Sequence, residues 1–111
     1  MSIEKRIFPR RSLRSKVIFE DETGEGFIYF YSTDVSLGGL FLEVDIPLKV
    51  GTRIFLSFTL SPASAPIRTT GQVVRVEREQ EGGLGVVGMG VRFTDLTEES
   101  RRLIGKYIET S

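Results

Sequence analysis

The chain has 111 residues and is formally neutral, with 15 lysines and arginines, 15 aspartates and glutamates, and no cysteine or histidine. This length suits one domain, and the missing residue types exclude disulfides, thiolate chemistry, Ser-His-Asp catalysis and histidine-based zinc or iron sites. No apolar stretch is long enough for membrane insertion and no signal peptide is recognisable, so the sequence predicts a cytoplasmic protein.

The first segment, residues 1–14, is predicted to be a flexible basic arm. From Lys5 to Lys16 the chain carries four arginines, two lysines and no carboxylate. Such a run is usually a solvated tail, although the apolar residues 7–9 could anchor it. Guanidinium groups also bind phosphates, pair with the O6/N7 edge of guanine and stack on bases, so the arm equally suits a nucleotide.

The remainder, residues 15–111, is predicted to be a mainly β domain. Six segments are rich in apolar, aromatic and β-branched residues, several of them alternating with period two, and turn residues separate them. Six short strands with short links favour an antiparallel β-barrel, because closure leaves no exposed sheet edge. The expected strands are Ser15–Glu20, Phe27–Thr33, Leu40–Val44, Arg53–Leu60, Ile67–Arg78 and Val86–Phe93.

Alternation also predicts which side chains face the barrel interior. In the strand Arg53–Leu60 the even-numbered apolar residues should point inward. In Val86–Phe93 the odd-numbered residues should do so, which places Gly88 and Gly90 on the outside.

The C-terminal segment changes to a helical period. Thr97 is a plausible N-cap, and two glutamates follow it in the first turn. Apolar residues then recur at helical spacing, namely Leu103, Ile104, Tyr107 and Ile108. The pattern predicts a C-terminal α-helix that lies with its apolar side on the barrel and plugs one end.

Two further motifs resemble ligand sites but predict none. The sequence GLGVVG, residues 83–88, matches the dinucleotide fingerprint GxGxxG, but a strand follows it where the fingerprint requires a helix. The sequence DETGEG, residues 21–26, lacks the alternating oxygen ligands and terminal glutamate of a calcium loop, and is interpreted as a solvated turn.

The sequence DVSLGG, Asp34–Gly39, lies between two expected strands. Taken alone it favours a simple turn, in which Asp34 and Ser36 accept hydrogen bonds from nearby backbone amides. A carboxylate can, however, also accept from the N1–H and N2–H₂ edge of guanine, which arginine cannot serve. Together with the basic arm, this turn could hold guanine by both edges.

These two motifs, in this order and within such a barrel, resemble the PilZ domain, the bacterial receptor module for the second messenger cyclic di-GMP. Residues 6–10, RIFPR, match the RxxxR motif of that family, and Asp34–Gly39 matches its D/NxSxxG motif. Further likeness in residues 71–76, residues 88–93 and the closing helix extends the resemblance over nearly the whole chain.

The resemblance implies a role for each motif residue. Arg6 and Arg10 would bind phosphate and the Hoogsteen edge of guanine, and could stack on the base. Asp34 and Ser36 would hydrogen-bond a guanine base and its neighbouring backbone. Gly39 would keep the floor of the site low enough for the ligand.

Three other cations lie near the first motif. Arg11 and Arg14 would either add phosphate contacts or only raise the local potential. A basic residue directly before RxxxR tends to accompany two stacked ligand molecules in this family, and Lys5 holds that position, so a ligand dimer is a hypothesis.

The resulting functional prediction is a cyclic di-GMP receptor whose arm becomes ordered on ligand binding and which signals through a partner protein. Ordering about ten residues costs on the order of 10 kcal/mol, so micromolar to submicromolar affinity is expected. Two alternatives stay open: a nucleotide-independent interaction adaptor of PilZ-like fold, and nonspecific DNA or RNA binding. Net neutrality disfavours the nucleic acid, and the sequence predicts no enzyme, metal or cofactor.

Overall fold

The structure is a computed structural model of the whole chain, and it describes residues 9–20, 27–44, 47–62, 64–78 and 86–109. These ranges form seven strands and one helix. In chain order they are β1 (Arg10–Ser12), β2 (Lys16–Glu20), β3 (Phe27–Ser36), β4 (Gly39–Glu43), β5 (Arg53–Phe58), β6 (Ile67–Arg78), β7 (Val86–Phe93) and α1 (Glu98–Glu109).

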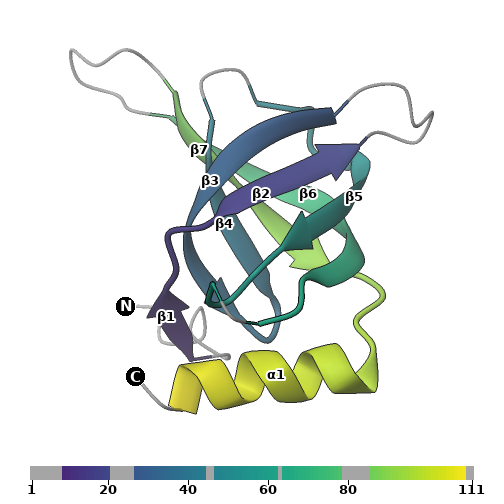
Figure 1. Cartoon of the computed structure of the whole chain (residues 1–111). Helices are drawn as coiled ribbons and strands as arrows, with labels where there is room; N and C mark the ends of the chain where they lie inside the picture. Colours follow the sequence, from purple (N-terminus) through teal and green to yellow (C-terminus); the bar gives the residue numbers. More distant parts are fainter. Residues whose placement is uncertain (1–8, 21–26, 45–46, 63, 79–85, 110–111) are drawn as a thin grey trace.

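Six of these strands close into an antiparallel barrel in the order β3-β2-β5-β6-β7-β4, and β4 pairs back onto β3 (Figure 1). The predicted six-stranded barrel with a C-terminal helix is therefore confirmed, and each expected strand is present. The short strand β1, which lies inside the segment expected to be an arm, adds a seventh strand beside the end of β3.

The barrel interior is filled by the side chains that alternation places inward. On β5 the buried residues are Ile54, Leu56 and Phe58, and on β7 they include Met89 and Val91. Burying this apolar surface is the main favourable term in folding. The period-two pattern thus identifies the core correctly on β5 and at Met89, Val91 and Phe93 of β7, while the side chain of Val87 lies outside what the structure describes.

Gly88 and Gly90 stand on the outer face of β7, as alternation predicts, but both are buried. Neighbouring side chains explain their burial: a Cβ at Gly88 would lie 2.6 Å from the Phe41 ring, and one at Gly90 would lie 2.8 Å from the Arg75 guanidinium. The guanidinium carbon of Arg75 in turn lies 5.4 Å from the centroid of the Phe41 ring.

Helix α1 lies across one end of the barrel, as predicted (Figure 1). The Thr97 hydroxyl caps it by accepting from the Ser100 amide at 3.0 Å. Ile104 is fully buried against the barrel, while Leu103, Tyr107 and Ile108 pack partly buried around it. In the described ranges, no helix has the length and apolar character needed to cross a bilayer.

Alanine substitutions at two adjacent positions of α1 should change the free energy of unfolding in opposite directions. Ile104→Ala removes a fully buried side chain and should lower the free energy of unfolding by about 2–5 kcal/mol. Gly105→Ala, whose new Cβ would meet nothing within 4 Å, should raise it by about 0.5–1 kcal/mol. Urea denaturation followed by circular dichroism measures both. A loss of stability in Gly105→Ala would mean that the helix is packed more tightly there.

Candidate functional site

The basic arm and the acidic motif lie side by side because β1 pairs antiparallel with the end of β3. Arg10 is opposite Ser36 in this ladder, and Ser12 is opposite Asp34. The motif residues Asp34 and Ser36 are the last part of β3, not a turn between strands as the sequence suggested. The turn itself is limited to residues 37–38. Backbone pairing with both β1 and β4 accounts for the longer strand.

The chain between β1 and β2 is held against β3 as well. The Leu13 amide donates to the Thr33 carbonyl at 3.0 Å, and the Leu13 side chain is buried in the core. The buried hydroxyl of Ser32 donates to the Leu13 carbonyl and accepts from the Ser15 amide. These contacts fix where the arm enters the barrel.

A β-bulge aims the carboxylate of Asp34 outward. Ser32 is paired with Leu42 and Asp34 with Phe41, so β3 contains one more residue than β4 between these pairs. The extra residue reverses the alternation, because a strand places successive side chains on opposite faces. Ser32 and Val35 consequently face the interior, and Asp34 faces out.

The outward carboxylate of Asp34 forms an ion pair with Arg10. Nη2 of Arg10 lies 2.7 Å from Oδ1 of Asp34, and Nε donates to the same oxygen at 2.9 Å. The two side chains are 28% and 32% exposed. Among the described residues, Oδ2 of Asp34 has one long contact of 3.4 Å, from the Thr33 hydroxyl. The pair therefore retains an acceptor oxygen and guanidinium donors that reach solvent.

Ser36 organises the turn that follows β3. Its side chain is buried, with 1% of its surface exposed, and its hydroxyl oxygen accepts from the amides of Gly38 at 3.0 Å and Gly39 at 3.3 Å. The Gly38 carbonyl accepts from the Phe93 amide at 2.9 Å, which ties the turn to β7. The structure thus gives Ser36 the local hydrogen bonds to neighbouring backbone that its motif suggests.

Gly39 is required by the contact between β4 and β7. A Cβ at this position would lie 1.9 Å from the carbonyl oxygen of Val91, which is backbone and cannot move independently. The packing of the barrel therefore requires glycine at position 39, independently of any role as the floor of a ligand site.

Arg11 connects the arm to the C-terminal helix. Its guanidinium carbon lies 4.0 Å from the centroid of the Tyr107 ring, and Nη1 donates to the Tyr107 carbonyl at 2.5 Å. That carbonyl belongs to the last turn of α1, where no intrahelical donor remains and a cation is favourable. The Tyr107 hydroxyl donates to the Ser12 carbonyl at 2.8 Å. Strand β1 lies beside this end of α1 in Figure 1.

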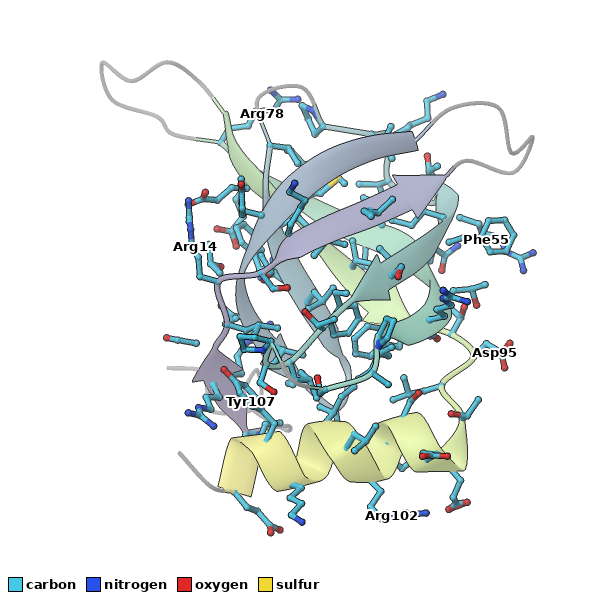
Figure 2. The ribbon with its side chains drawn as sticks, in the orientation of Figure 1. Arg14, Phe55, Arg78, Asp95, Arg102 and Tyr107 are labelled. Carbon is cyan, nitrogen blue, oxygen red and sulfur yellow. The ribbon has the colours of Figure 1, made fainter. Side chains whose placement is uncertain are left out.

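Arg14 lies on the exposed surface where the arm enters the barrel (Figure 2). It pairs with Glu43 at 3.0 Å, and its guanidinium carbon lies 5.0 Å from the centroid of the Tyr31 ring. Tyr31 is 45% exposed and is therefore available to a flat ligand such as a purine.

The structure thus brings Arg10, Asp34, Ser36 and Gly39 together at one end of the β3–β4 hairpin. Arg6 and Lys5 lie outside the described residues, and so does the sequence DETGEG. Sequence reasoning missed Tyr31, Glu43 and Tyr107, which contact the arm. These three residues are far from the arm along the chain, so no local sequence pattern links them to it. The nearest indication of such a contact is an aromatic residue on the outer face of a strand.

Chemically, the site offers guanidinium donors and a carboxylate acceptor within one small area. Such a pair suits a planar group that presents acceptors on one edge and donors on another, as guanine does. No cluster of acidic side chains able to hold a metal ion occurs among the residues that the structure describes.

Comparisons with known proteins agree with this architecture. A family model described as the PilZ domain matches residues 4–110, nearly the whole chain. The chain belongs to the PilZ domain family. A comparison of this PilZ domain chain with curated proteins gives no sequence match.

Solved structures show the same fold at low sequence identity. The Bacillus subtilis inhibitor of motility, MotI/DgrA, has a TM-score of 0.81 at 17% identity over 97% of this chain. The match spans 51% of that protein, so the chain is about half as long. The PilZ domain of Escherichia coli YcgR with c-di-GMP has a TM-score of 0.73 at 14% identity, over 96% of this chain and 90% of that one.

Alanine substitutions at Gly39 and Gly90, both of them buried, should distinguish crowding by the backbone from crowding by a side chain. Gly39→Ala forces a Cβ against the Val91 carbonyl and should lower the free energy of unfolding by at least about 3 kcal/mol. Gly90→Ala meets the flexible end of Arg75 and should cost about 1 kcal/mol or less. Equal losses in urea denaturation would contradict the assignment of Gly39 to the β4–β7 contact.

Proposed function

We propose that this chain is a bacterial, cytoplasmic receptor for cyclic di-GMP, and that it signals through a partner protein without catalysing a reaction. The observation that carries the proposal is the placement of Arg10 beside Asp34 by the β1–β3 ladder. Membership of the PilZ family and similarity to the YcgR domain with c-di-GMP support the choice of ligand.

The chemistry of the ligand complements this pair. Each guanine presents O6 and N7 as acceptors on one edge and N1–H and N2–H₂ as donors on another. Arg10 would serve the first edge or a phosphate, and Asp34 would serve the second. Charge-assisted hydrogen bonds of this kind are among the stronger ones available to a protein.

Ligand binding would have to compete with the existing ion pair. Both partners are about one-third exposed, and such pairs contribute roughly 0.2–1 kcal/mol, so exchanging Arg10 onto the ligand costs little. The ion pair would hold the guanidinium of Arg10 and the carboxylate of Asp34 in position until cyclic di-GMP binds. Arg6, four residues before Arg10, would then close over the ligand, and Lys5 would favour a second, stacked molecule.

The signal would pass from the arm to the barrel surface. Arg11 and the backbone of Ser12 contact Tyr107, so any shift of β1 on ligand binding changes the contacts of α1. A partner protein would recognise the ordered arm together with this end of the helix.

A nucleotide-independent adaptor is the second candidate. The observation in its favour is that Arg10, Arg11 and Arg14 all have internal partners, namely Asp34, Tyr107 and Glu43. An adaptor would use this docked arm as a fixed part of its surface and would show no heat on addition of nucleotide.

Calorimetry with cyclic di-GMP distinguishes these candidates. The wild type should bind with micromolar or tighter affinity, and Arg6→Ala, Arg10→Ala and Asp34→Ala should each weaken binding at least tenfold, since each removes a charged contact. Arg102→Ala, on the outer face of α1, is the matched control and should bind as the wild type does.

The same titration measures stoichiometry. Two nucleotides per chain, falling to one in Lys5→Ala, would support the stacked dimer. Absence of binding by the wild type would leave the adaptor as the function. Unchanged affinity in Asp34→Ala, together with a steep loss in salt, would instead indicate nonspecific recognition of phosphates.

A further inference from the structure

A groove crosses the outer face of the barrel on the side away from the arm. Three depressions over β5 and β6, of about 450, 630 and 190 Å³, share lining residues and none of the three is lined by Arg10 or Asp34. Thr70 lines all three of them. Phe55 and Asp95 lie on one side of the molecule in Figure 2, and Arg14 lies on the other.

Two arginines and an aromatic ring dominate this groove. Phe55 is 48% exposed and stands between Arg53 and Ser57 on the outer face of β5. Arg68 is opposite Ser57 in the β5–β6 ladder. Arg53 and Arg68 are exposed and have no ion pair or hydrogen bond within the part of the chain that the structure describes.

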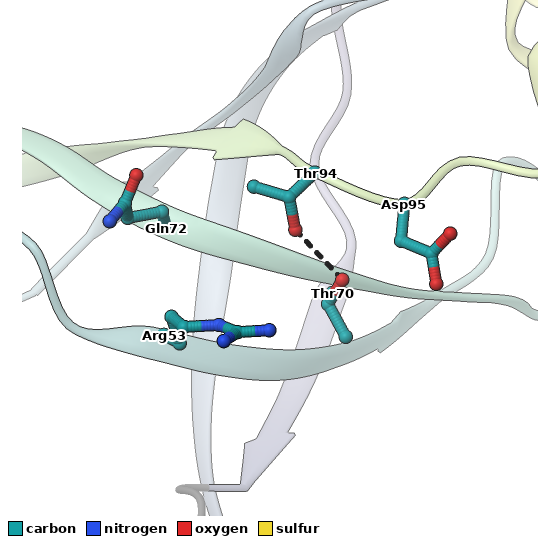
Figure 3. Close-up of a pocket in the computed structure, with 5 residues that line it drawn as sticks. All are labelled: Arg53, Thr70, Gln72, Thr94 and Asp95. Atoms are coloured by element: carbon teal, nitrogen blue, oxygen red, sulfur yellow. Dashed lines mark hydrogen bonds between the residues drawn. The ribbon is translucent and has the colours of Figure 1, made fainter.

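Polar groups complete the lining. Thr70 and Thr94 share a hydrogen bond of 2.8 Å, and the Arg53 side chain extends toward Thr70 in the close-up of Figure 3. The hydroxyl groups offer donors and acceptors to a bound backbone. Asp95 borders the groove. The groove thus combines the arginines Arg53 and Arg68 with the carboxylate of Asp95.

The spacing of these groups indicates the shape of the occupant. Arg53 and Ser57 are four residues apart, roughly 13 Å along a strand that rises ~3.3 Å per residue, with Phe55 midway. An extended peptide has the same rise, and its residues i, i+2 and i+4 lie on one face. Carboxylates at i and i+4 would therefore meet the two arginines while an apolar residue at i+2 meets Phe55.

We propose that this groove binds an extended segment of a partner protein with the pattern acidic-x-apolar-x-acidic. A nucleic acid strand carries a charge at every nucleotide and would place phosphates over Phe55 and beside the Asp95 carboxylate, so the charge arrangement favours the peptide. The inference goes beyond the proposed nucleotide site, because none of its residues contacts the arm and binding requires no ligand there.

The test is an NMR titration of the ¹⁵N-labelled full chain with the capped peptide Ser-Glu-Thr-Phe-Thr-Glu-Ser. Binding should be weak, with a Kd of roughly 0.1–1 mM, because exposed ion pairs contribute little. Amide shifts should concentrate at residues 53–57, 68–72 and 94–97. The double variant Arg53→Glu/Arg68→Glu should reduce the shifts at least fivefold at equal peptide concentration, while its cyclic di-GMP affinity stays that of the wild type.

Two controls make the result specific. The permuted peptide Ser-Phe-Thr-Glu-Glu-Thr-Ser has the same composition without the pattern, and should shift these amides at least fivefold less. Arg101→Glu/Arg102→Glu makes the same charge change on the exposed side of α1, and should leave binding of the first peptide unchanged.

Three results would overturn the proposal: no shifts at millimolar peptide, equal shifts with the permuted peptide, or an equal loss in the α1 variant. Shifts of the groove amides on addition of cyclic di-GMP to the variant Arg10→Ala/Asp34→Ala, which lacks the proposed nucleotide site, would also overturn it, since the groove would then bind the nucleotide. None of these results bears on the affinity of the Arg10–Asp34 site, so the two proposals fail separately.

Discussion

The antiparallel pairing of β1 with the end of β3 is the constraint on which the site depends. It converts a run of positive charge, which by itself would be a solvated tail, into a strand whose cations lie at fixed positions beside a carboxylate. The bulge in β3 is the second requirement, because without it Asp34 would point into the core with Ser32. Backbone geometry, more than side-chain attraction, therefore brings the two motifs together.

The contacts of the arm also link the candidate site to two other parts of the molecule. The arm is attached to the barrel through Leu13 and Ser32, and to α1 through Arg11 and Tyr107. Each attachment comes from a different element, so a change at β1 reaches both the barrel and the helix. The groove over β5 and β6 lies on the other side of the molecule from Arg14.

Most of the fold could be predicted from the sequence because its signals are local. Period-two alternation located the strands and their buried faces, and Thr97 with the helical repeat located α1. Burial of Gly88 and Gly90 could not be predicted, since it depends on side chains that reach over from Phe41 and Arg75. The bulge that turns Asp34 outward has no local signature either, because it reflects the register with β4.

The proximity of the two motifs was predictable from the sequence, but the other contacts of the arm were not. The paired motifs predicted that Arg10 and Asp34 lie together, as the structure shows, whereas the partners of Arg11 and Arg14 lie in α1 and on β3 and β4, and only the closed barrel brings them near. Ser36 and Gly39 belong to the same motif, but the structure shows that both also serve the β3–β4 turn and the β7 contact.

The most direct test of the account is the charge-swapped double variant Arg10→Asp/Asp34→Arg. A swapped ion pair should keep the β1–β3 ladder, so the amide NMR spectrum and the free energy of unfolding should stay within about 1 kcal/mol of the wild type. The affinity for cyclic di-GMP should nevertheless fall at least tenfold, because each charge would then face the wrong edge of the ligand. A swapped variant that binds the nucleotide as the wild type does would contradict the account.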